Sequence, residues 1–163
     1  MNSTNEIKVV NIRMVREPSL YSETPITNPQ DVMDTIAKEL ATYDREVFGI
    51  LNLKSNGQVI NMNICSIGTL NSSMVNGREV FKSAILSNAS SFICFHVHPS
   101  GNPVTSREDT AVTEKLAEAG RFLDIPLVDH CIIAGGTGGM YSFKANGLMD
   151  NIQTRMRSEI SER

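Results

Sequence analysis

In three segments of this chain apolar residues recur with a helical spacing, which predicts a helix in each. The first begins at Asn28-Pro29, where Asn fits the cap and Pro the first helical position, and it continues to about Tyr43. The other two cover 78–88 and 106–123. The side chains expected to face the core are Val32, Met33, Ile36, Leu40 and Tyr43, then Val80, Phe81, Ala84 and Ile85, then Val112, Leu116, Ala119 and Phe122.

Shorter apolar runs predict strands. The pair Asn56-Gly57 is typical of a hairpin turn between two of them, and the run Phe92 to Phe95 is apolar on both faces, as in a central strand. The order of strands and helices predicts one mixed α/β domain. The expected strands are 6–16, 46–53, 58–65, 92–98, 126–134 and 140–143.

Length and composition fit a single domain with one core, since the chain has 163 residues and is 40% hydrophobic. We expect residues 1–28 to be a strand and loop packed on the domain, 29–148 the domain itself, and 149–163 a polar tail, frayed if helical. The net charge of −3 lacks the basic footprint of nucleic-acid binders. The sequence contains neither a membrane-length apolar run nor a secretory signal, which favours a cytoplasmic location without a membrane partner. The oligomeric state stays open.

The most informative stretch contains His96, His98, Ser106 and Asp109. Residues i and i+2 of a strand project from one face, so both imidazoles can reach one metal ion. Asp109 follows at the third position of a helix for which Ser106 fits the N-cap. Catalytic zinc usually takes three protein ligands, which these residues supply, and Glu46 is our candidate for the base beside them.

A structural interpretation accounts for the same residues in another way. The histidines would be partly buried polar groups, and Asp109 would only cap its helix. Cys94 shares the strand face of His96 and His98, so it could lie near a metal without binding it. His130 stands in an apolar run and reads as a buried, hydrogen-bonded histidine or as a partner of a ligand.

The motif His96-Val97-His98-Pro99, six residues, then Ser106 to Asp109 matches the JAMM (MPN+) pattern H-x-H-P-x(6)-S-x-x-D. The chain resembles the JAB domain of RadC-like proteins within that metalloprotease superfamily. It departs in having Val97 where RadC-like proteins commonly have Asn, and residues 1–28 are too short for their N-terminal helical module. Further matching stretches are Gly68-Thr69-Leu70, Arg78 to Phe81, His98 to Gly101 and Leu127 to His130.

The resemblance implies a JAMM or cytidine-deaminase-like fold, a curved mixed sheet flanked by helices. It also implies that His96, His98 and Asp109 bind zinc (Zn²⁺) and that Glu46 exchanges protons with the attacking water. Ser106 would help to stabilise the oxyanion. The expected reaction is hydrolysis of a peptide or isopeptide bond in a peptide or protein substrate.

The alternative is a non-catalytic RadC-type module that binds DNA or a DNA-repair partner. The acidic charge balance weighs against DNA, and the complete ligand set with Glu46 weighs against an inactive enzyme. A zinc nucleobase deaminase is disfavoured because its H-x-E…P-C-x-x-C signature is absent.

Overall fold

The computed structural model describes residue 14, residues 29–68 and residues 75–161. Apart from Met14, the strand expected over 6–16 lies outside these residues, as do Thr69 and Leu70 of one matched stretch and the side chain of Val32. The elements along the chain are α1 (Pro29–Leu40), β1 (Val47–Leu53), β2 (Val59–Ile67), α2 (Gly77–Leu86), β3 (Ser91–His98), α3 (Arg107–Phe122), β4 (Leu127–Ala134), β5 (Met140–Ser142) and α4 (Leu148–Ser161).

The strands form one mixed sheet in the order β2-β1-β3-β4-β5. β1 and β2 are joined by the Asn56-Gly57 turn, where Gly57 takes a φ of 82°, a backbone conformation that suits glycine. β1 also pairs antiparallel with β3, which runs parallel to β4. The prediction that residues 92–98 form a central strand in a single α/β domain is confirmed.

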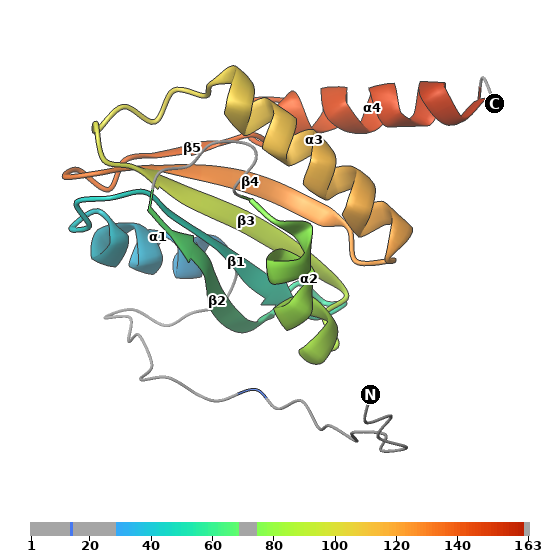
Figure 1. Cartoon of the computed structure of the whole chain (residues 1–163), viewed down its shortest axis with the longest axis horizontal. Coiled ribbons are helices and arrows are strands. Elements are labelled where there is room, and N and C mark those ends of the chain that lie inside the picture. Colours follow the sequence, from blue (N-terminus) through green and yellow to red (C-terminus); the bar gives the residue numbers. More distant parts are fainter. Residues whose placement is uncertain (1–13, 15–28, 69–74, 162–163) are drawn as a thin grey trace, which may run out of the picture.

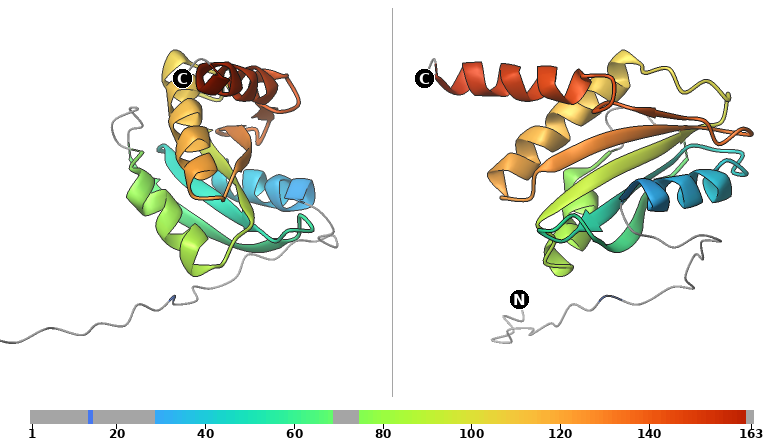
Figure 2. Two further views of the ribbon diagram at one scale, coloured as in Figure 1. Left: turned by 90° about the vertical axis from the view of Figure 1, so that its right-hand side faces the viewer. Right: turned by 180° about the vertical axis from the view of Figure 1, so that it is seen from behind.

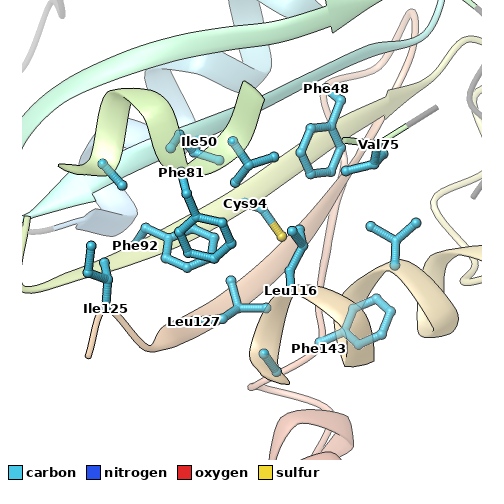
Figure 3. Packing of buried hydrophobic residues seen from close by; sticks show 14 of the residues in the cluster. Phe48, Ile50, Val75, Phe81, Phe92, Cys94, Leu116, Ile125, Leu127 and Phe143 are labelled. Carbon is cyan, nitrogen blue, oxygen red and sulfur yellow. The ribbon is translucent and has the colours of Figure 1, made fainter. Parts of the chain in front are cut away.

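Helices cover both faces of the sheet (Figures 1 and 2). α1 covers one face through Met33, Ile36 and Leu40, as its spacing predicted. α2 and α3 cover the other face, and their buried side chains pack with the strands into a second cluster, part of which Figure 3 shows. That cluster includes Phe48, Phe81, Phe92, Cys94, Leu116, Leu127 and Phe143.

Successive residues of β3 alternate between these two clusters. Phe95 and Val97 pack on the α1 side, whereas Phe92 and Cys94 pack on the side of α2 and α3. Because the alternation continues, His96 and His98 project toward the first turn of α3. Val97 therefore faces away from them, as expected.

Three side chains predicted to face the core are exposed: Tyr43 (39%), Ile85 (56%) and Phe122 (86%). Tyr43 lies beyond the end of α1, and Ile85 lies one residue before the end of α2. In α3 Val112 and Leu116 are buried as predicted, and the rest of the buried face is formed by Asp109, Thr113, Ala117 and Gly120.

Gly120 explains why the last turn of α3 buries a different side from the one predicted. A Cβ at this position would lie 2.5 Å from the Ile125 carbonyl oxygen and 3.2 Å from a ring carbon of Phe92. The helix therefore contacts the sheet through a residue without a side chain. The chain then leaves α3 through Asp124, whose φ is 57°, and Ile125 donates its N–H to the Gly120 carbonyl at 2.9 Å.

Most of the expected polar tail, residues 149–163, belongs to the helix α4 (Leu148–Ser161). Met149 and Ile152 are 1% and 2% exposed and belong to the core on the α3 side. An ion pair between Arg155 and Glu114 links α4 to α3. Nowhere in the described ranges is a helix long and apolar enough to cross a bilayer.

Candidate metal centre

Three potential ligand groups meet where β3 ends and α3 begins. The Nε2 atoms of His96 and His98 lie 2.7 Å apart. The Asp109 carboxylate approaches both, with Oδ1 at 3.1 Å from His96 Nε2 and Oδ2 at 3.6 Å from His98 Nε2. His96 and Asp109 are buried, at 1% and 6% exposure.

The separations of these atoms suit one bound ion. Two atoms that each bind zinc at about 2.0–2.1 Å lie at most about 4.2 Å apart, and all three separations are shorter. Two neutral Nε2 acceptors at 2.7 Å would repel each other unless a proton or a cation lay between them. His96, His98 and Asp109 could thus hold a metal ion.

The carbonyl of Asn102 sets which nitrogen His98 offers. His98 Nδ1 lies 2.8 Å from Asn102 O, and a carbonyl oxygen only accepts hydrogen bonds. The proton must therefore be on Nδ1 in the neutral ring. Nε2, which faces His96 and Asp109, is left with its lone pair.

A capping box at the start of α3 orients Asp109. The Ser106 hydroxyl accepts a hydrogen bond from the Asp109 N–H at 3.0 Å, and Asp109 Oδ2 accepts one from the Ser106 N–H at 2.7 Å. The predicted N-cap and third helical position are confirmed. The helix terminus therefore turns the carboxylate back toward the strand end.

Charge within the site favours an ionised carboxylate. Burial alone would raise the pKa of Asp109, but hydrogen bonds from His96 and His98, which their rings can donate through Nε2 when they are protonated, outweigh it and hold that pKa far below its ordinary value. The hydrogen bond to Asp109 in turn raises the pKa of His98 above its ordinary value. In the metal-free protein the site therefore attracts a positive charge, either a proton or a cation.

Glu46 directly precedes β1 and lies on the same side of the sheet as His96 and His98. Phe48 pairs with His96 across the antiparallel ladder, so the register continued by two residues sets Glu46 opposite His98. The charges of His96, His98 and Asp109 all act on Glu46. Burial is the largest effect on Glu46, and it raises the pKa of this half-buried carboxyl.

Two buried residues stand behind His96, and the sequence predicted only one of them. His130 is fully buried, and its Nε2 lies 2.8 Å from His96 Nδ1. Its Nδ1 lies 2.6 Å from the hydroxyl of Thr113, which donates to the Asp109 carbonyl at 2.6 Å. Burial lowers the pKa of His130 well below its ordinary value, so the ring stays neutral.

One feature of the sequence could have indicated that Thr113 belongs to the site. It lies four residues after Asp109, one turn along the helix and on the same face. Cys94, by contrast, is fully buried in the core and is not part of the metal-ligand group found in the described residues. Ser106 is exposed at the helix start.

The chain is similar in sequence to proteins of one family. The profile of the RadC-like JAB domain matches residues 26–148. A UPF0758 protein of Caldanaerobacter subterraneus is 44% identical over 125 residues, which are 77% of this chain and 53% of that protein.

Two further UPF0758 proteins match this chain with similar identity and coverage. A UPF0758 protein of Desulforamulus reducens is 46% identical over 121 residues, 74% of this chain and 52% of its own length. A UPF0758 protein of Methanosarcina mazei is 40% identical over 139 residues, which are 83% of this chain and 60% of that protein. This chain thus spans about half the length of these relatives. With its mixed sheet, flanking helices and His-His-Asp group, the chain belongs to the RadC-like JAB domain family of the JAMM superfamily.

Proposed function

We propose that this domain is a zinc-dependent hydrolase of peptide or isopeptide bonds. One observation carries the proposal: three ligand groups of a kind that zinc prefers converge, with the two imidazole Nε2 atoms 2.7 Å apart. A bound zinc ion would lower the pKa of a water from about 15.7 to about 7 and polarise the scissile carbonyl.

In this proposal Glu46 is the proton carrier. Its carboxylate accepts a proton from the attacking water and delivers it to the leaving amine. A raised pKa suits a group that must both take and give a proton near neutral pH.

Ser106 stabilises the oxyanion in the proposed reaction. Its hydroxyl accepts the Asp109 N–H, which leaves the O–H proton to be donated. The position at the N-terminus of α3 adds the positive end of the helix dipole. The substrate is a peptide or protein, and this domain acts in the cytoplasm.

The first test is metal content by elemental analysis of protein purified without added zinc. We expect about one zinc per wild-type chain and little in His98→Ala, because that variant loses one of three ligands. A wild type that holds no zinc, even after reconstitution at neutral pH, would contradict the proposal.

The second arm compares peptide and isopeptide cleavage by wild type and Glu46→Gln. The variant should keep its zinc while its rate falls at least 10²–10⁴-fold, the usual contribution of an acid–base group. Loss of zinc would make Glu46 a ligand instead. The non-catalytic RadC-type module would be favoured if the wild type binds zinc but cleaves none of these substrates, and if it also retards DNA in an electrophoretic mobility assay at physiological salt.

A further inference from the structure

The buried residues His130 and Thr113 form a hydrogen-bonded chain that joins two of the proposed ligands. It begins at His96 in β3, passes through His130 in β4 and Thr113 in α3, and ends at the backbone of Asp109. Each contact is between 2.6 and 2.8 Å. His96, His130 and Thr113 are at most 1% exposed, so water does not compete for these contacts.

The proton positions along this chain follow from its last member. The Asp109 carbonyl can only accept, so the single Thr113 hydroxyl proton points to it. Thr113 must then accept from His130, which sets the His130 proton on Nδ1. In a neutral ring Nε2 is then an acceptor, and it receives the Nδ1 proton of His96.

These proton positions determine the protonation of His96 Nε2, the atom that faces the proposed metal site. With its proton on Nδ1, His96 offers a bare Nε2 lone pair toward His98 and Asp109. The opposite tautomer would put a proton where an ion must bind and would leave two acceptors facing each other at 2.8 Å.

Ring packing keeps His130 in this position. Phe143 stacks on it with ring centroids 4.9 Å apart and an interplanar angle of 17°, and Phe48 meets it edge-on at 6.2 Å. An imidazole wedged between two aromatic rings cannot turn over without displacing the core.

We propose that His130 and Thr113 are positioning residues that fix the His96 tautomer and couple the strand ligand to the helix ligand. This inference rests on the proposed metal site, since it assigns a role in metal affinity. It predicts that removing the Thr113 hydroxyl weakens zinc binding although Thr113 never contacts the ion.

The variants are Thr113→Val, which keeps the shape and loses the hydroxyl, and Thr113→Ser, which restores it. Thr110→Val is the matched control, because the Thr110 hydroxyl also bonds a carbonyl four residues back, that of Ser106 at 3.2 Å. Zinc affinity is measured by competition with a chelator. We expect Thr113→Val to bind about 10–100-fold more weakly, and Thr113→Ser and Thr110→Val to match wild type.

A second readout needs no bound metal and no activity. Long-range proton–nitrogen NMR of the metal-free wild type reports the tautomer of each histidine, and we expect Nδ1–H for His96 and His130. An Nε2–H tautomer of His96, or a Thr113→Val variant with wild-type affinity, would overturn the inference. A protein with the expected tautomers that takes up no zinc would instead refute the proposed function.

Discussion

At the scale of single residues, the two histidines of the metal centre differ in what holds their second nitrogen. His98 Nδ1 donates to the Asn102 carbonyl in the segment between β3 and α3. His96 Nδ1 contacts His130, a buried side chain from another strand. Both arrangements leave the Nε2 lone pair free, but only the first leaves its histidine partly accessible to solvent.

Zinc affinity should therefore fall as the pH falls through the His98 pKa. Because the hydrogen bond to Asp109 raises that pKa above its ordinary value of 6.5, a proton on Nε2 competes with the ion already near neutral pH. Below this pKa the apparent affinity should drop about tenfold per pH unit. Chelator competition at several pH values between about 5.5 and 8 measures the slope.

The metal-free fold should show the opposite trend. A raised pKa means that the His98–Asp109 pair stabilises the fold below the unfolded pKa, and that this contribution is lost as the pH rises through the folded pKa.

A zinc affinity that does not change between about pH 5.5 and 8 would exclude His98 as a ligand that competes with a proton.

At the scale of elements, periodicity predicted what each segment becomes but not always which side it buries. The alternation in β3 was interpreted correctly, because both of its faces are apolar until His96. In α3 the interpretation gave too much weight to Phe122 and too little to Thr113 and Gly120. When a helix contacts a sheet partly through a polar residue and a glycine, the spacing of its hydrophobic residues does not identify the whole buried face.

The same reasoning explains which parts of the site were visible in the sequence. His96, His98, Ser106 and Asp109 lie within one strand, turn and helix start, so spacing and capping rules apply to them. The contact of His130 with Thr113 joins β4 to α3 and depends on how those elements pack. Spacing within one element does not report such a contact.

Two variants of α3 test the observed face directly. Gly120→Ala should destabilise the protein by about 1–3 kcal/mol, because its Cβ would meet the Ile125 carbonyl oxygen at 2.5 Å. Phe122→Ser should change the free energy of unfolding by no more than about 0.5 kcal/mol, since Phe122 is 86% exposed. Denaturant unfolding monitored by circular dichroism compares them, and a reversed order would refute the assigned face.

At the scale of the whole molecule, the metal centre joins separate parts of the fold. Its ligands come from β3 and α3, while His130 in β4 and Glu46 before β1 stand beside them. An ion bound here would hold these parts together in the folded state only, so its binding free energy adds to the stability of the entire domain.

Zinc should accordingly raise the melting temperature. At a free concentration 100 times the dissociation constant, the stabilisation is about 2.7 kcal/mol. For a protein of this size that corresponds to roughly 5–10 °C. Calorimetry with zinc and with a chelator measures the difference, and His98→Ala is the control in which the shift should vanish. An equal shift in that variant would place the stabilising zinc elsewhere.

The hydrogen bond from His98 to Asn102 has a consequence for how this domain can vary among its relatives. The acceptor is a main-chain oxygen, which every amino acid supplies. Substitution at position 102 therefore leaves that acceptor in place, whereas an insertion or deletion between Pro99 and Asn102 would move it away from the ring. At position 102 selection should therefore act on the length of the turn rather than on residue identity, and relatives should tolerate a substitution of Asn102 far better than a gap before it.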